Sequence, residues 1–299
     1  TAFVEVKARF DEARNLQWAG EMEEAGVRVF YSKPGIKVHS KIALVTREEE
    51  SGEKDYAFLG TGNFNESTAR IYADHALLTA DPRLTRDLDQ VFRFLWEEID
   101  APKCEHLLVA PTSLRNRLTE LITRESENAR SGIIAGMALK MNSLEDRKMI
   151  DLLYDASKAG VRINLIVRGI CCMKPGLPEW GENVRARSIV DRFLEHARVF
   201  RFVNGGSPVL YLASADLMKR NLNRRVEVAF PIYDPKVKGE LEHFLHLQLS
   251  DNAKARVLDP DQANNYVGRR VGEPRVEAQE GFYHWLEERL VDSMEPGAT

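Results

Sequence analysis

Two histidines in this sequence each stand two positions before a basic residue, at the start of an apolar stretch. His39 precedes Lys41 in VHSKIALV, and His196 precedes Arg198 in EHARVFRF. A single histidine on an apolar strand is more often a satisfied core residue than a catalyst. Two copies of the same arrangement favour a functional site built from two related halves.

Other features recur around both histidines in the same order. A turn and a return strand follow each one, and Leu-Gly-Thr-Gly-Asn at 59–63 matches Leu-Ala-Ser-Ala-Asp at 212–216. About thirty residues before each histidine a strand ends in an arginine, Arg9 or Arg168. Hydrophobic patterning explains recurring strands but not matched polar residues. The sequence therefore predicts a duplicated half-site that faces itself across a cleft.

These residue types point to phosphoryl chemistry. An imidazole acts as a nucleophile toward phosphorus when a neighbouring amide or carboxylate fixes its tautomer. Guanidinium groups bind phosphoryl oxygens through paired hydrogen bonds, and an ammonium adds a point charge. The candidates for fixing the tautomer are Asn63, Asn65 and Asp216, and the candidate cations are Arg9, Lys41, Arg168 and Arg225.

Two common nucleotide-binding schemes are missing from the sequence. It contains neither GxxxxGK[ST] nor the glycine-rich loop of protein kinases, so a nucleotide would bind in another way. No cluster of Asp and Glu suggests a dedicated metal cage. Because Mg²⁺ is often held by phosphates and water, we expect it to arrive with the nucleotide.

Composition limits the class of protein. The chain has 299 residues, 43% of them hydrophobic, and no apolar run approaches the roughly 20 residues that cross a bilayer. The net charge of -4 would repel a polyanion unless basic residues gather in one cleft. Three cysteines without CxxC spacing suggest a reducing cytoplasm. We expect a soluble protein of two domains.

Alternating strand and helix patterns predict an α/β fold with covered sheets. Strands are expected at 3–9, 27–31, 37–46, 56–60, 75–80, 107–111, 136–141, 161–169, 195–202 and 209–218, and helices at 11–26, 84–99, 112–130, 146–159, 234–251 and 277–292. A charged turn is expected at 48–55. The stretch DAPKCEH breaks the pattern and predicts two domains, at 1–105 and 106–299.

The motifs KARFDE, KVHSKIALV, YAFLGTGNFNESTARIYADHALLTAD, LYDASKAGVRINLIVRGICC and SADLMKRNLNRRVEV together resemble the polyphosphate kinase family over nearly the whole chain. The resemblance implies two phospholipase D-like α/β domains related by a pseudo-two-fold repeat, with mixed sheets flanked by helices. The family also has an N-terminal helical domain and a head domain that this sequence lacks. We therefore expect a piece of a longer protein.

The resemblance also implies roles for individual residues. His39 resembles the histidine that takes the γ-phosphoryl group of ATP, and His196 resembles a second essential histidine. Tyr72, Arg168 and Arg225 match positions that contact nucleotide or phosphate, and Lys41 and Asn63 are expected beside them. Arg9 matches a position associated with Mg²⁺ and phosphate. Because arginine has no lone pair to donate, we expect Arg9 to act through phosphate and not as a metal ligand.

The implied reaction is reversible transfer of the terminal phosphate of ATP to inorganic polyphosphate through a phosphohistidine at His39. The implied partners are ATP, ADP and polyphosphate, with Mg²⁺ as the cofactor. Neither nucleic acid nor a membrane is indicated, and the full-length protein is expected to form a homo-oligomer. We expect His196, when protonated, to stabilise the leaving phosphate oxygen.

Two alternative functions stay open. A phospholipase D-type phosphodiesterase would share the fold. Its HxKxxxxD motif is not met, since Thr46 stands five residues after Lys41 and the second copy reads HAR. A non-catalytic module that binds polyphosphate or nucleotide is the other alternative, because the N-terminal and head domains are absent.

Overall fold

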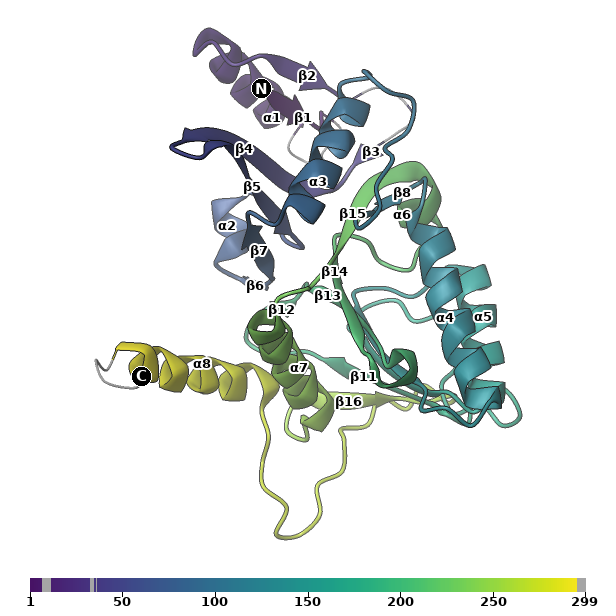
Figure 1. Ribbon diagram of the computed structural model, residues 1–299. Coiled ribbons are helices and arrows are strands. Elements are labelled where there is room, and N and C mark those ends of the chain that lie inside the picture. The colour runs from purple at the N-terminus through teal and green to yellow at the C-terminus, as the bar shows by residue number, and fades with distance from the viewer. Residues whose placement is uncertain (7–11, 33–34, 36, 295–299) are drawn as a thin grey trace.

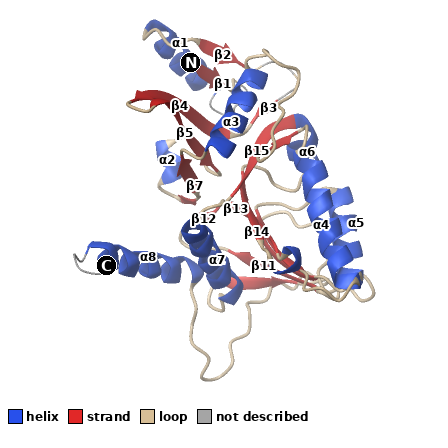
Figure 2. Cartoon of the chain, in the orientation of Figure 1, coloured by secondary structure: helices blue, strands red, loops and turns tan. Residues whose placement is uncertain are grey.

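The computed structural model describes residues 1–6, 12–32, 35 and 37–294 of the chain. Arg9, one of the predicted site residues, lies outside them. Helices and strands mix throughout both halves (Figure 2). None of the described helices has the length and apolarity that a membrane crossing needs.

The first half contains two small sheets. Strand β1 (Ala2–Val4) pairs in parallel with β2 (Val29–Tyr31), and helix α1 (Glu12–Glu24) connects them. Strands β4 (Lys41–Glu49), β5 (Gly52–Gly60) and β7 (Ala76–Thr79) form an antiparallel sheet. Helix α3 (Pro82–Leu95) buries Leu84, Leu88 and Val91 against one face of that sheet, together with Ala57 and Leu59. Short elements α2 (Glu66–Ala69) and β6 (Tyr72–Ala73) lie between β5 and β7 in sequence.

The second half is built on a nine-stranded mixed sheet in the order β16-β11-β10-β9-β13-β14-β15-β3, with β8 also on β15. Its strands are β3 (Lys37–Val38), β8 (Leu108–Ala110), β9 (Gly136–Met141), β10 (Arg162–Val167), β11 (Val184–Ile189), β13 (Arg198–Phe202), β14 (Val209–Ala213), β15 (Arg225–Pro231) and β16 (Ala255–Leu258). Helices α4 (Leu114–Arg130) and α5 (Arg147–Lys158) cover one face and α7 (Pro235–Ser250) covers the other (Figure 1). Helix α8 (Ala278–Met294) packs on α7 and extends away from the sheet.

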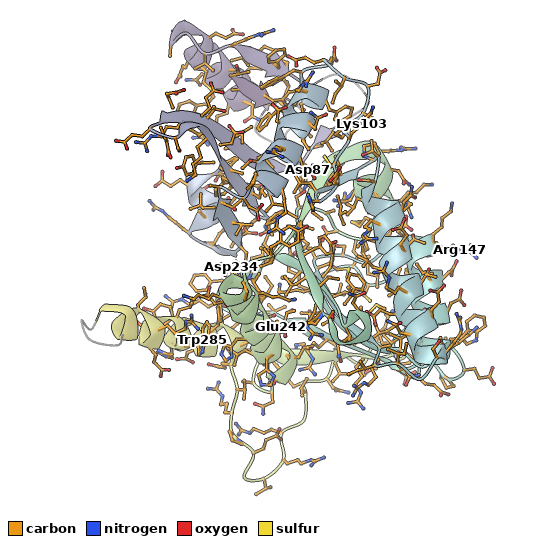
Figure 3. All side chains as sticks on the ribbon, in the orientation of Figure 1. Asp87, Lys103, Arg147, Asp234, Glu242 and Trp285 are labelled. Atoms are coloured by element: carbon orange, nitrogen blue, oxygen red, sulfur yellow. The ribbon has the colours of Figure 1, made fainter. Side chains whose placement is uncertain are left out.

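Three of these helices begin at an aspartate that the sequence places before the apolar pattern. The carboxylates of Asp81, Asp146 and Asp234 accept hydrogen bonds from backbone N–H groups in the first turns of α3, α5 and α7. Such caps satisfy N–H groups that have no partner inside the helix. Asp87, which lies inside α3 and is labelled in Figure 3, accepts hydrogen bonds from the backbone of His106 at 2.6 Å and Leu107 at 2.8 Å. This carboxylate therefore fixes the connection between the halves against the first one.

Short strands are exchanged between the halves. Strand β3 (Lys37–Val38) of the first half pairs in parallel with the start of β15 in the second. Strand β12 (Leu194–Glu195) of the second half pairs in parallel with β6 in the first. Each exchanged strand ends immediately before one of the two histidines.

The predicted α/β class, with mixed sheets flanked by helices, is confirmed. Three predicted details are wrong. The charged stretch 48–55 is mostly strand, because β4 and β5 continue their ladder to Glu49 and Gly52 and leave a two-residue turn. The strand expected at 37–46 is broken at His39 and Ser40, whose N–H groups bond to β15. The strand expected at 195–202 is broken at His196 and Ala197, whose N–H groups bond to β6. Strands β6, β11, β15 and β16 were not predicted. The division at residue 105 stays a prediction.

Candidate active site

His39 lies in the break between β3 and β4. The N–H groups of His39 and Ser40 both donate to the carbonyl of Val226, at 2.9 and 3.1 Å. The ring Nδ1 of His39 lies 2.9 Å from Oε2 of Glu227, which is completely buried. Both contacts come from β15, so the second half orients the histidine of the first.

His196 lies in the break between β12 and β13 in the same way. The N–H groups of His196 and Ala197 both donate to the carbonyl of Ala73, at 3.1 and 3.0 Å. Its Nδ1 lies 2.8 Å from Oδ1 of Asp74. Here the first half orients the histidine of the second, which makes the two half-sites reciprocal.

The carboxylates that meet the histidines are not the predicted ones. Asn65 caps helix α2, since its Oδ1 accepts from the N–H of Thr68 at 3.0 Å. Asp216 forms an ion pair with Arg198 at 3.2 Å. The prediction that one of these residues fixes an imidazole tautomer is therefore wrong, and Asn63 makes no such contact among the described residues. Glu227 and Asp74 perform that role.

The matched sequences at 59–63 and 212–216 supply a hydroxyl to each carboxylate. Oγ1 of Thr61 donates to Asp74 at 2.7 Å, and Oγ of Ser214 donates to Glu227 at 2.5 Å. Both pairs are 13 residues apart in sequence. With Nδ1–H of the imidazole also donating, each carboxylate is held in its ionised, acceptor-only form.

The basic residue after each histidine folds back onto it. Nζ of Lys41 donates to the carbonyl of His39 at 2.5 Å, and Nη1 of Arg198 donates to the carbonyl of His196 at 2.7 Å. Arg198 also places Nη1 3.2 Å from Nε2 of His196. No group in the described part of the chain meets Nε2 of His39 in this way. The two half-sites therefore differ at the ring nitrogen that faces away from the carboxylate.

Arg168 is held by an amide instead of a carboxylate. Its Nε donates to Oδ1 of Asn142 at 2.8 Å, and the N–H of Asn142 donates to Asp216 at 2.8 Å. Gly169 donates to the carbonyl of Asn142 at 2.9 Å, where a Cβ on Gly169 would also lie only 2.9 Å from that oxygen. Asp216 thus fixes Arg198 directly and Arg168 through Asn142.

The other predicted residues surround the two histidines. Nη1 of Arg225 lies 4.0 Å from Oε1 of Glu227. The ring of Tyr72 lies 4.9 Å from the ring of His196. Tyr72 and Asn63 line a pocket of about 230 Å³ that also reaches Asp74. The structure therefore brings Lys41, Asn63, Tyr72, Arg168 and Arg225 to the two half-sites.

Burial and the surrounding charges shift the pKa values of the site. Burial lowers the pKa of His39, against the opposing effect of Glu227. Burial also lowers the pKa of His196, while its hydrogen bond to Asp74 opposes the shift. Burial lowers the pKa of Lys41 to about 7. Burial alone would raise the pKa of Glu227, but His39 and Lys41 bring it below its usual range. Both imidazoles are therefore held neutral beside ionised carboxylates.

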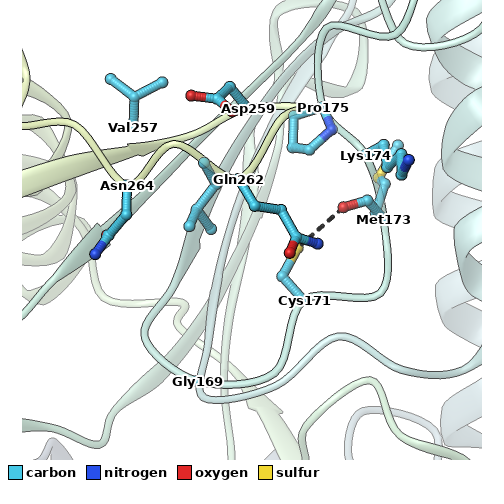
Figure 4. A pocket seen from close by; sticks show the side chains of 10 residues that line it. Gly169, Cys171, Met173, Lys174, Pro175, Val257, Asp259, Gln262 and Asn264 are labelled. Atoms are coloured by element: carbon cyan, nitrogen blue, oxygen red, sulfur yellow. Dashed lines mark hydrogen bonds between the residues drawn. The ribbon is translucent and has the colours of Figure 1, made fainter.

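A second pocket lies next to Gly169, the residue after Arg168. It has a volume of about 280 Å³ and is lined by residues such as Cys171, Lys174, Gln262 and Asn264 (Figure 4). One ammonium and one carboxylate line it, Lys174 and Asp259, so it offers no excess positive charge. None of the predicted site residues that the structure describes lines this pocket.

The described residues contain no group of three or more His, Cys, Asp or Glu side chains that could hold a metal ion. The carboxylates at the histidines are already engaged: Glu227 and Asp74 with imidazoles and hydroxyls, and Asp216 with Arg198. This donor set does not fit a protein-held metal. A divalent ion bound mainly by phosphates would need no further ligand here.

The class of fold is shared with an enzyme of very different sequence. The crystal structure of phosphatidylserine synthase from Haemophilus influenzae Rd KW20 is similar with a TM-score of 0.55 and 11% identity, over 96% of this chain and 80% of that one. At that identity the likeness concerns the fold alone. The chain is a two-domain α/β protein of phospholipase D-like fold, as predicted, with a histidine site shared between its halves.

Closer similarity defines the family. Residues 1–101 match the model of polyphosphate kinase C-terminal domain 1, and residues 107–279 match that of polyphosphate kinase C-terminal domain 2. Polyphosphate kinase of Escherichia coli K12 is 45% identical over 96% of this chain and 41% of its own length. Polyphosphate kinase 1 of Chlorobaculum tepidum is 47% identical over 93% and 40%. The crystal structure of polyphosphate kinase from Porphyromonas gingivalis is similar with a TM-score of 0.88 and 44% identity, over 96% of this chain and 44% of that one.

The chain belongs to the polyphosphate kinase family. It spans about two fifths of the length of the curated relatives that it matches.

Proposed function

We propose that this chain is the catalytic part of a polyphosphate kinase, in which His39 carries the phosphoryl group between ATP and inorganic polyphosphate. One observation supports this most strongly. Glu227 holds Nδ1 of His39, and no described residue bonds to its Nε2. A carboxylate at Nδ1 fixes the tautomer that carries a lone pair on Nε2, which a nucleophile requires.

His196 is less suited to be the nucleophile. Its Nδ1 is held by Asp74, as in the other half-site, but its Nε2 faces an N–H of Arg198 at 3.2 Å. That donor occupies the lone pair and keeps the ring neutral. When a phosphate takes over the N–H groups of Arg198, Nε2 becomes free to accept a proton, and Asp74 stabilises the imidazolium. We propose that His196 then donates to the leaving phosphate oxygen.

The transfer proceeds in two balanced steps. In the first, Nε2 of His39 forms a bond to the γ-phosphorus while the bond to the bridging oxygen breaks and ADP leaves with that oxygen. In the second, a terminal oxygen of polyphosphate attacks the phosphorus and the N–P bond breaks, which restores neutral His39. Two easier displacements replace a direct reaction between two polyanions. The same steps in reverse make ATP.

Cations around the histidines match the charge that develops on the transferred group. Arg168 is bonded to the amide of Asn142, so its charge is not neutralised by a carboxylate at that contact. Arg225 lies 4.0 Å from Glu227. Because the imidazole of His39 also bonds to that carboxylate, Glu227 neutralises Arg225 only in part. Lys41 adds an ammonium beside His39. Fixed cations in a half-buried site stabilise phosphoryl oxygens without reorganisation of solvent.

The nucleotide base has a place near these groups. The pocket beside Tyr72 and Asn63 opens next to Asp74, which holds His196. We propose that ATP enters with Mg²⁺ on its phosphates, since the carboxylates at the site are engaged. Arg9 is proposed to contact the same phosphates. A cytoplasmic location, assembly of the full-length protein into a homo-oligomer and the absence of nucleic-acid binding stay predictions.

The phosphodiesterase alternative gains no support from the structure. Thr46, at the position of the expected aspartate, lies on the exposed end of β4 and donates to Asp55 at 2.6 Å. The aspartate of a HxKxxxxD motif is therefore absent from the first half-site. The kinase and the binding-module alternatives differ in one measurable property, the covalent phosphate.

The test is labelling with γ-³²P-ATP and Mg²⁺, carried out on the full-length protein that contains this chain. We expect a base-stable, acid-labile label that is lost in His39→Ala and retained in His284→Ala, a control at an exposed histidine. Label that persists in His39→Ala would assign the phosphate to another residue. Absence of label in the wild-type protein, together with retained polyphosphate binding, would favour the non-catalytic module.

A further inference from the structure

A stripe of basic side chains lies on helix α6 (Lys219–Arg224), next to the site. The helix and the residue after it read KRNLNRR, with four basic residues in seven positions. Lys219, Arg220 and Arg224 are exposed, whereas Asn221 and Leu222 are buried. Arg220 and Arg224 are four residues apart and therefore share one face of the helix.

The stripe is attached rigidly to the half-site of His39. The buried side chain of Asn221 donates to Oε1 of Glu227 at 2.6 Å, and the other oxygen of Glu227 meets His39 at 2.9 Å. The helix ends at Arg224 and strand β15 begins at Arg225 without a connecting loop. The exposed cations are therefore continuous with Arg225 in the site.

Within the part of the chain that the structure describes, no carboxylate pairs with the basic side chains of this stripe. Within the described residues, Lys219, Arg220 and Arg224 form no ion pair through their side chains. The carboxylate of Glu145 accepts from the backbone N–H of Lys219 at 3.1 Å, in the first turn of the helix. Such a concentration of unpaired cations is unusual in a chain of net charge -4. It marks a surface for an anion.

Under the proposed function, the inner cations bind a ligand as long as the phosphate tail of a nucleotide. Lys41, Arg168 and Arg225 surround the two histidines. The stripe extends the positive surface by about 9 Å, the length of six helical residues. Only a ligand with further phosphates would reach that far. The helix carries no aromatic side chain on which a base could stack, which disfavours single-stranded nucleic acid.

We propose that Lys219, Arg220 and Arg224 form an outer subsite for linear inorganic polyphosphate, which guides the growing chain away from His39 past Arg225. This inference rests on the proposed function for the identity of the chain that occupies the inner site. The stripe supplies no group to the phosphoryl transfer itself. Its contribution is to hold several successive phosphates, so its effect increases with chain length.

The test compares Arg220→Ala/Arg224→Ala with Arg269→Ala/Arg270→Ala, a matched pair of exposed arginines on the loop between β16 and α8. Binding to the full-length, unphosphorylated protein is measured for long-chain polyphosphate, tripolyphosphate and oligothymidylate over a range of salt. We expect the α6 variant to bind long-chain polyphosphate about tenfold more weakly, with a salt slope smaller by about 1 to 2. The loss for tripolyphosphate should stay below about twofold, and the control variant should bind all three ligands like the wild type.

Three results would overturn the outer subsite. They are an equal loss for long and short phosphate chains, no loss for either, and a loss confined to oligothymidylate, which would make α6 a nucleic-acid surface. The comparison does not depend on phosphorylation of His39. A chain-length-dependent loss in a protein that takes no label from ATP would reject the kinase proposal and keep the subsite. Normal labelling by ATP without a chain-length-dependent loss of binding would keep the kinase proposal and reject the outer subsite.

Discussion

The half-site of His39 and the half-site of His196 share one framework but differ where a phosphate would approach. In both, an exchanged strand ends before the histidine, and a carboxylate from the opposite half holds Nδ1. A hydroxyl 13 residues before that carboxylate supports it. The shared features orient the imidazoles, so they cannot decide which ring is the nucleophile.

The difference lies in the cation. Arg198 reaches Nε2 of its histidine, while Lys41 stops at the carbonyl oxygen of His39. Asp216 holds Arg198 in a buried ion pair, and Asn63 takes the equivalent position of the other half. The guanidinium of Arg198 therefore occupies the lone pair on Nε2 of His196, whereas the ammonium of Lys41 leaves the lone pair on Nε2 of His39 free. The two half-sites thus share one framework and differ in the cation beside the histidine.

The largest effect is expected from the two carboxylates. Glu227→Gln keeps the shape of a buried side chain but permits the wrong tautomer of His39. We expect the rate of labelling by ATP to fall by roughly 10²- to 10⁴-fold. Asp74→Asn leaves His39 and its tautomer intact and weakens only the proton donation by His196 to the leaving oxygen, so it should reduce labelling less.

The two variants are compared by rapid-quench labelling, with thermal unfolding as the control for folding. Equal losses in both variants would contradict the division of roles. A larger loss in Asp74→Asn would move the nucleophile to His196.

The next effect concerns Asn142, which links Arg168 to Asp216. Asn142→Ala removes a hydrogen bond to a charged group, worth about 1.5 to 3 kcal/mol. We expect kcat/KM for ATP to fall by about 10- to 100-fold. Asn142→Asp should retain the position of Arg168 but neutralise part of its charge, so the loss should appear mainly in KM. Asn183→Ala is the control, because that amide bonds to Ser157 away from the site at 2.9 Å. A loss in thermal stability without a change in kcat/KM would make Asn142 structural.

The fold class and the two histidines could be predicted from the sequence, because alternation and a repeated His-x-basic pattern are local signals. Asp74 and Glu227 were missed because each acts across the exchange of strands, and no local pattern shows which half a short strand joins. One signal was present. The matched hydroxyls of Thr61 and Ser214 are each followed 13 residues later by a carboxylate. Comparing the two halves over these 13 further residues would have identified both Asp74 and Glu227.

A smaller effect is expected where the repeat differs in side-chain volume. Gly62 in the first half corresponds to Ala215 in the second. A Cβ on Gly62 would overlap the carboxylate of Asp74. Gly62→Ala should therefore destabilise the fold by about 1 to 3 kcal/mol and displace Asp74 from His196. The reverse change, Ala215→Gly, should cost only about 0.5 to 1 kcal/mol. Chemical denaturation measures both, and equal costs would mean that the two turns have the same space.

The smallest effect separates the two cations by pH. Burial lowers the pKa of Lys41 to about 7, whereas an arginine at the same position stays charged. Above that pH the free protein has lost the proton that phosphate binding requires, so affinity for ATP should fall by about threefold to tenfold between pH 7 and 8.5. Lys41→Arg, which copies the second half-site, should remove this decline.

If the longer guanidinium also reaches Nε2 of His39, as Arg198 reaches His196, labelling should slow while binding stays strong at high pH. Equilibrium binding of a non-hydrolysable ATP analogue measures the first effect, and rapid-quench labelling measures the second. A pH profile that Lys41→Arg leaves unchanged would place the titrating group elsewhere, and labelling as fast as in the wild type would mean that the guanidinium does not occupy Nε2 of His39.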